Sequence, residues 1–235
     1  MQNKIKATIF VMALMMPTFV FAQSATNSIY IDQVGDSSTI TVQQQGPSNK
    51  VGSEATPFNL QGSNQNITFN QNGSGNLIEG AVNNADNVDM TINAVGDDNT
   101  ITIDHGSTAS VAGSSTTLDV TGSTNTVSLT QGNNSSSTGA TQAISITGDL
   151  NTHTSTINTN DVTNNVTVAG DSNTTTMTQN GHSGKTVDML LTGNSNTVTV
   201  NQTSTAHADS ISINSTANNG SITINQCGVS GNCAQ

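Results

Sequence analysis

The sequence contains no tryptophan and no arginine, and only 3% of its 235 residues are aromatic. Hydrophobic residues make up 32% of the chain, too few for the core of an ordinary globular domain. Four cationic residues stand against 15 acidic ones, which gives a formal net charge of −11. Because phosphate-binding surfaces need clustered cations, this composition excludes binding to nucleic acid or to anionic lipid. Richness in Gly, Ser, Thr and Asn alone is typical of disorder, so periodicity must decide the fold class.

Long apolar runs are absent except at the N-terminus. Lys4 and Lys6 precede the stretch ATIFVMALMMPTFVFA, which ends in a Val-Phe-Ala cleavage pattern. This predicts a signal peptide at residues 1–22, and a membrane anchor is disfavoured because the stretch is short and Pro17 interrupts it. We therefore expect an exported chain with no integral membrane span. Loss of the two lysines would change its charge from −11 to −13.

Only two cysteines are present, and both lie in the C-terminal segment 227–235. Cys227 and Cys233 are too far apart for a CxxC redox motif, and no histidine lies nearby to complete a metal site. In an oxidising compartment this spacing predicts a disulfide that closes a small loop.

Short glycine-led segments recur along the chain, such as GDSSTITVQQQG at Gly35 and GDSNTTTMTQNG at Gly170. Glycine followed by Asp, Ser or Asn is typical of a tight turn. Counting this glycine as position 0 predicts turns at Gly35, Gly62, Gly96, Gly122, Gly148, Gly170 and Gly193, with Ala217 in an eighth unit. Asparagine follows at position +3 in most units, at Asn99, Asn125, Asn151, Asn173 and Asn196.

Positions +5, +7 and +9 alternate along a strand, so they share one face. Position +5 predicts an aliphatic column of Ile40, Ile67, Ile101, Val127, Val198 and Ile222. Position +9, together with one glutamine before the first turn, predicts an amide column of Gln33, Gln44, Gln71, Gln131, Gln179, Gln202 and Gln226. An inward glutamine is costly unless its amide is paired, and a glutamine in each neighbouring unit supplies that pairing.

Each unit thus reads strand, turn, strand, with too few apolar side chains to fold alone. Stacking the units makes the apolar columns continuous and pairs the backbone on both sides. The sequence predicts an all-β fold, a β-solenoid of about eight strand-turn-strand coils over residues 23–226.

This repeat resembles that of the curlins, the subunits of curli, which are functional amyloid fibres of bacterial surfaces. The family repeat runs roughly Ser-x5-Gln-x-Gly-x3-Asn-x-Ala-x3-Gln. Gln33-Val34-Gly35 matches its Gln-x-Gly part, and Asn99 and Gln131 match its later positions. The resemblance covers about residues 27 to 227.

The resemblance implies an amyloid-like, curlin-type solenoid that is exported to the cell surface. It implies passage through an outer-membrane secretion pore, a nucleator subunit as partner, and homopolymer growth through the solenoid ends. The fibres of this family serve cell adhesion and form biofilm matrix, so an extracellular location follows from it.

An ice-binding solenoid is the alternative prediction. Outward positions +4 and +6 hold Thr-x-Thr pairs that resemble the arrays of antifreeze β-solenoids. The pairs are Thr39/Thr41, Thr100/Thr102, Thr152/Thr154, Thr174/Thr176 and Thr197/Thr199. Threonine is also simply a good outward strand residue.

The motifs of catalysis are absent from the sequence. No nucleophile elbow, phosphate loop or metal-ligand cluster is present, so we expect no enzyme and no cofactor. The four histidines fall on unrelated unit positions, and His105 replaces a ladder glutamine. Turn acids could line one edge and bind calcium, although such residues usually only form turns. They are Asp36, Asp97, Asp98, Asp149 and Asp171.

Overall fold

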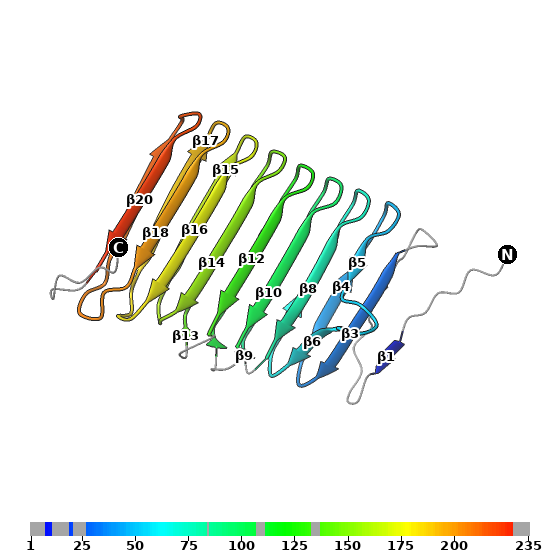
Figure 1. Cartoon of the computed structure of the whole chain (residues 1–235). Coiled ribbons are helices and arrows are strands. Elements are labelled where there is room, and N and C mark those ends of the chain that lie inside the picture. The colour runs from blue at the N-terminus through cyan, green and yellow to red at the C-terminus, as the bar shows by residue number, and fades with distance from the viewer. Residues whose placement is uncertain are drawn as a thin grey trace.

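The computed structural model describes residues 8–10, 19–20, 27–83, 85–106, 111–132 and 137–227. Over these residues the chain forms parallel-paired strands joined by turns, with no helix. The strands stand side by side in one long row, in chain order from β3 to β20 (Figure 1). The predicted all-β solenoid of about eight coils is confirmed.

The first face of the solenoid is a single parallel sheet. Each coil contributes one strand to it, and each strand pairs with those of the coils before and after. In order, its strands are β3 (Ser28–Val34), β5 (Lys50–Val51) with β6 (Phe58–Gln61), β8 (Leu77–Val82), β10 (Thr100–His105), β12 (Thr126–Gln131), β14 (Thr152–Asn158), β16 (Thr174–Asn180), β18 (Thr197–Gln202) and β20 (Ser221–Gln226).

The second face returns the chain across the core and is less regular. Its continuous strands are β4 (Thr39–Val42), β7 (Asn66–Ile67), β15 (Thr163–Ala169), β17 (Thr186–Thr192) and β19 (Ser210–Ser215). The short strands β9 (Ala85–Asp86), β11 (Val111–Ala112) and β13 (Ser137–Thr138) form a separate small sheet. Residues such as Ala94 (φ 54°) and Val120 (φ 52°) leave the extended backbone, which interrupts the middle of this face.

One coil carries an insertion in the middle of its strand. Residues 52–57 leave the sheet between β5 and β6, and Ser53 and Thr56 close the loop with an N–H···O bond of 2.9 Å. The register is kept on both sides, because Val51 pairs with Ile78 and Leu60 pairs with Val82. The inserted residues therefore lengthen the coil in sequence without changing the register of its strand.

The core lies between the two faces and consists of one layer of side chains from each. Aliphatic residues of both faces are buried along its whole length, for example Leu60, Ile103 and Ile146. Phe58 and Phe69 meet edge to face across it, with ring centroids 5.1 Å apart. Stacking thus makes a continuous core from a sequence poor in apolar residues.

At the N-terminal end two short strands extend both faces. β1 (Thr8–Phe10) pairs with β3, and β2 (Phe19–Val20) pairs with β4. The edge of the first coil therefore accepts one more parallel strand on each face. The signal peptide at 1–22 stays a prediction. In the described residues no helix is long and apolar enough to cross a membrane.

Candidate functional site

The turn that joins the second face to the first, here called the Gly–Asn corner, stacks its glycines in one column. The column consists of Gly46, Gly73, Gly96, Gly122, Gly148, Gly170 and Gly193, followed by Ala217. Gly35 and Gly62 stack on each other instead at the opposite corner, where β3 and β6 end. The predicted register of the first two units was therefore wrong. Both corners carry glycine followed by a polar residue and an alternating strand, so local sequence does not distinguish them.

Glycine is required in this column chiefly because successive coils approach closely. A Cβ on Gly122 would overlap the carbonyl oxygen of Gly148, and the same holds from coil to coil. A positive φ occurs at Gly170 (107°), but the left-handed residue common to these turns is at position +2, for example Ser172 (59°) and Ser195 (58°). The column is thus set by stacking more than by backbone conformation.

An uninterrupted asparagine ladder runs along the Gly–Asn corner. Asn125 donates its N–H and its Nδ2 to Asn99 Oδ1, at 2.9 and 3.0 Å. Its Nδ2 also donates to the carbonyl of Gly148 at 2.8 Å. The ladder consists of Asn27, Asn49, Asn76, Asn99, Asn125, Asn151, Asn173 and Asn196. The sequence pattern missed its first three members because it misplaced the first turns, although Gly46 and Gly73 each precede an asparagine by three residues.

The glutamines predicted as one column occupy two. Gln71 donates to Gln44 (3.1 Å) on the second face. On the first face, Gln179 donates to Gln202 (2.8 Å) and Gln202 to Gln226 (2.9 Å).

Two further glutamines have no glutamine neighbour in the first-face column. Gln33 stacks on Leu60. Gln131 lies between His105 and Ile157 and bonds Ser114 and Ser137 instead. The amide column of this face is therefore continuous only at its C-terminal end.

The predicted aliphatic column is also divided between the faces. Ile40 pairs with Ile67 on the second face. On the first face Ile101 pairs with Val127, and Val198 pairs with Ile222. Between these pairs the column holds His153 and Thr175, and before them it holds Ile29, Val51 and Ile78, which the sequence pattern assigned no place.

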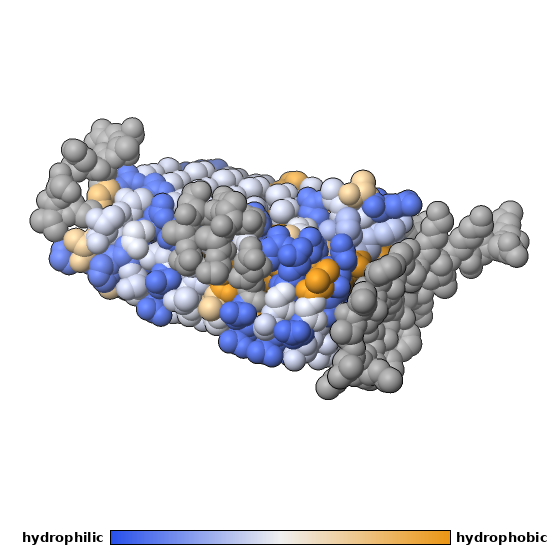
Figure 2. Space-filling view, turned by 90° about the horizontal axis from the view of Figure 1, so that it is seen from below, coloured by the Kyte–Doolittle hydropathy of each residue, from blue (hydrophilic) through white to orange (hydrophobic). Residues whose placement is uncertain are grey.

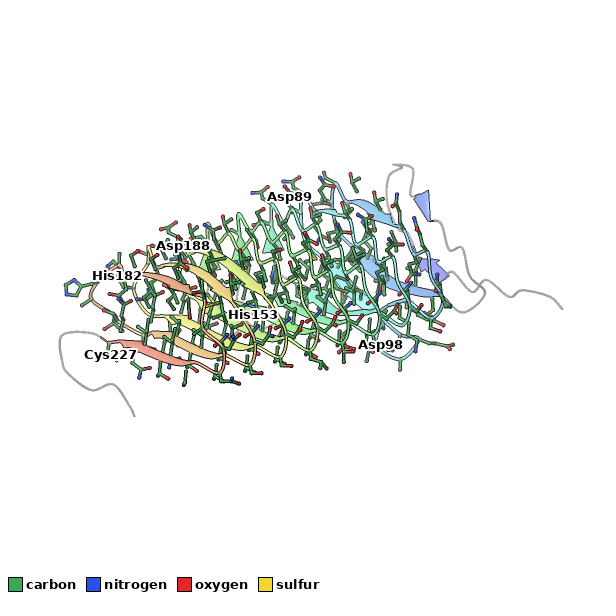
Figure 3. All side chains as sticks on the ribbon, turned by 90° about the horizontal axis from the view of Figure 1, so that it is seen from above. Asp89, Asp98, His153, His182, Asp188 and Cys227 are labelled. Carbon is green, nitrogen blue, oxygen red and sulfur yellow. The ribbon has the colours of Figure 1, made fainter. Side chains whose placement is uncertain are left out.

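Polar side chains fill the interior of the central coils. His153 lies between the two faces (Figure 3), and its Nδ1 is 2.6 Å from Thr175 Oγ1. Burial without an acidic partner lowers the pKa of His153 and of His105 to about 4. Both histidines are therefore neutral at pH 7.

Two buried amides of the interior are unpaired. The amide of Gln142 has no hydrogen-bond partner in the described chain, nor has that of Asn164.

One buried cation was also missed by the sequence pattern. Lys185 is fully buried at the corner opposite the Gly–Asn corner, and its Nζ lies 2.9 Å from Asp209 Oδ2. The ion pair compensates the burial of the ammonium group.

Side chains of the turn acids accept hydrogen bonds from the backbone of the preceding coil. Asp149 Oδ1 accepts the N–H of Ser123 in the preceding coil (2.7 Å), and Asp171 Oδ1 accepts that of Asp149 (2.9 Å). Asn194 accepts the N–H of Asp171 in the same way (2.8 Å). In the described residues no three His, Cys, Asp or Glu side chains are grouped to hold a metal ion, so calcium binding has no support here.

The outer side of the first face carries rows of hydroxyl groups. From β12 to β20 the outward position +4 holds Thr126, Thr152, Thr174, Thr197 and Ser221, and position +6 holds Ser128, Thr154, Thr176, Thr199 and Thr223. These five strands carry no Asp, Glu or Lys. Thr39 and Thr41 belong to the second face and lie outside these rows.

Charged residues lie elsewhere on the surface, on the first face before β12, on the second face and at the edges. Asp89 and Asp188 lie on the outside of the second face (Figure 3). The edge seen in Figure 2 is mostly hydrophilic, with hydrophobic residues in small patches.

Incompletely buried core residues mark the two ends of the solenoid. Ile29, Ile31 and Ile40 of the first coil pack on the core but stay partly exposed, as do Ile222 and Ile224 of the last strand. Cys227, which follows that strand, is disulfide-bonded. Cys233, the only other cysteine, lies outside the described residues.

No family model, no curated protein and no solved structure matches this chain.

Proposed function

We propose that this chain is an exported, curlin-like structural subunit that assembles end to end into extracellular amyloid-like fibres for cell adhesion and biofilm matrix. The observation that carries the proposal is the match between the two solenoid ends. β3 presents Ile29, Ile31 and Gln33 inward, and β20 presents Ile222, Ile224 and Gln226 in the same order.

Stacking β20 of one copy on β3 of the next continues these three columns without a break. On the second face the same step places Ile211 on Ile40 and Ile213 on Val42. Each joint would bury aliphatic side chains that are partly exposed in the single chain, and would pair two open strand edges. Growth by edge-strand addition follows from these two gains.

The N-terminal segment bears on this proposal. β1 and β2 lie against the edge that the joint would use. Removal of residues 1–22 by signal cleavage frees that edge. The excess of acidic residues keeps the processed chain soluble until its ends meet.

The further partners follow from the resemblance alone. A nucleator subunit would offer the first edge, and an outer-membrane pore would pass the chain unfolded. No cofactor and no catalytic activity enter this function.

The test is fibre formation by the purified processed chain, followed by thioflavin fluorescence and electron microscopy. Ile224→Lys should reduce the elongation rate at least tenfold, because a joint would bury its ammonium group. Thr223→Lys is the matched control, since this neighbour points outward on the same strand. A wild-type chain that stays monomeric, or equal elongation by the two variants, would contradict the proposal.

Ice binding is the second candidate, and the register of the hydroxyl rows favours it. Rows with about 4.8 Å between strands and about 6.7 Å along a strand form a flat, uncharged lattice from β12 to β20. Inhibition of ice growth by a monomer, lost in Thr176→Lys and kept in Thr167→Lys on the second face, would support this function over fibre assembly.

A further inference from the structure

We infer that Gly220, in the last turn of the solenoid, slows the addition of the next copy, because the asparagine ladder ends at this residue. This inference rests on the proposed function. It concerns the Gly–Asn corner of the last described coil, which departs from every earlier coil at two positions. Ala217 stands in the glycine column, and Gly220 stands where the other coils have a ladder asparagine.

Gly220 ends the asparagine ladder. Its N–H donates to Asn196 Oδ1 at 2.8 Å, as the ladder residues do, but it has no side-chain oxygen for the next coil. At the other end of the molecule Asn27 has a buried Nδ2 with no hydrogen-bond partner in the described chain. In a copy-on-copy joint Asn27 lies over Gly220, so it meets no side-chain Oδ1 like the one to which each internal ladder asparagine donates its N–H.

The joint is therefore matched along both strand faces and mismatched at this corner. The columns that end in Ile222, Ile224 and Gln226 all find like residues in the next copy. The corner lacks one amide rung. Favourable burial with an unpaired donor gives a contact that forms but forms slowly.

The variant Gly220→Asn tests the inference, because it restores the asparagine that internal corners such as GNSN at 193–196 have at this position. A Cβ at 220 meets Asn196 Oδ1 at 3.0 Å, the end of a side chain that can adjust. With equal amounts of sheared wild-type seeds, we expect the variant to elongate about tenfold faster or more, as one restored amide rung implies.

The control is Gly220→Ala, which adds a Cβ without an amide and should elongate no faster than wild type. The denaturant midpoint of unassembled Gly220→Asn should not fall below that of wild type, because its new amide can donate to Asn196 Oδ1 as Asn196 donates to Asn173 Oδ1. Equal elongation rates for Gly220→Asn, Gly220→Ala and wild type would overturn this inference and leave the proposed function intact. Assembly by none of the chains would overturn the proposed function and this inference with it. Assembly by Gly220→Asn alone would support the inference.

Discussion

Two sets of buried polar residues in this solenoid differ in whether the neighbouring coils satisfy their hydrogen bonds. The asparagines of the Gly–Asn corner from Asn49 to Asn196 are hydrogen-bonded to the coils on either side, as Asn125 is to Asn99 and Gly148. The polar residues inside the central coils, such as His105 and Gln142, keep side-chain atoms without partners. The difference teaches that a buried polar group stabilises a repeat fold when every coil repeats it, and costs free energy when neighbours differ.

The largest expected effect is a loss of stability in acid, which acts on the buried histidines and not on the asparagine ladder. Burial lowers the pKa of His105 and His153 to about 4 from 6.5, so the unfolded chain binds more protons than the folded chain between these values. Stability should be fully present above pH 6.5, fall as the pH drops, and lose about 3 kcal/mol per histidine below pH 4. The asparagine ladder has no titratable group.

Chemical denaturation between pH 7 and pH 5 measures this loss before the carboxylates protonate. The double variant His105→Gln/His153→Val restores the residue types of the two columns and should flatten the profile in that window. A wild-type profile as flat as that of the variant would contradict the assignment of neutral buried histidines.

Removing one rung should break the ladder itself. Asn125→Ala takes away the acceptor of the Asn151 N–H and the donor to Gly148, and we expect a loss of about 3 kcal/mol in the free energy of unfolding. The adjacent Thr126→Ala removes an outward hydroxyl and should cost less than about 0.5 kcal/mol. Similar losses for both variants would show that the ladder is not what holds this corner.

Replacing an unpaired interior amide should sharpen the contrast. Gln142→Leu removes a buried amide that has no partner in the described chain, and we expect a gain of about 1 kcal/mol. Gln71→Leu breaks bonds to Gln44 and to the Lys50 carbonyl, and should lose about 1 kcal/mol instead. Opposite signs in urea unfolding support the comparison, and equal signs contradict it.

The smallest effect is expected at the turn acids. Asp171→Asn keeps the oxygen that accepts the Asp149 N–H, and Asn194 already fills this role one coil later. The midpoint of thermal unfolding should shift by no more than about 2 °C, whereas Asp171→Ala should lower it further. A large shift in Asp171→Asn would mean that the charge, rather than the acceptor, is what this turn uses.

Much of the fold followed from the sequence because stacking repeats the same residue types at the same places. From Gly96 onward the predicted turn glycines are those that stack at the Gly–Asn corner, whereas the opposite corner was not predicted. The first two units were assigned to the wrong corner, since GDSSTITVQQQG at Gly35 and GDDNTITIDHG at Gly96 are similar local sequences. With Gly46 and Gly73 as the turn glycines, the spacings run from 22 to 27 residues, and the 34-residue gap that the sequence register required disappears.

The interior was harder to predict than the turns. Glutamine at position +9 predicts an amide column, but a column exists only where the next coil also has glutamine. Gln33 stacks on Leu60, and Gln131 stacks on His105. These neighbours depend on the lengths of the coils between them, which a single repeat unit does not reveal. The Lys185–Asp209 pair is likewise a contact between coils.

The insertion at residues 52–57 has a consequence for how such a molecule can be decorated. The two halves of that strand, Lys50–Val51 and Phe58–Gln61, hold their places against neighbouring coils independently. A strand can therefore be opened in its middle and lengthened outward while the coils above and below stay in register. In a linear array this opening recurs once per copy, so a peptide placed there would be displayed at regular intervals along the whole assembly.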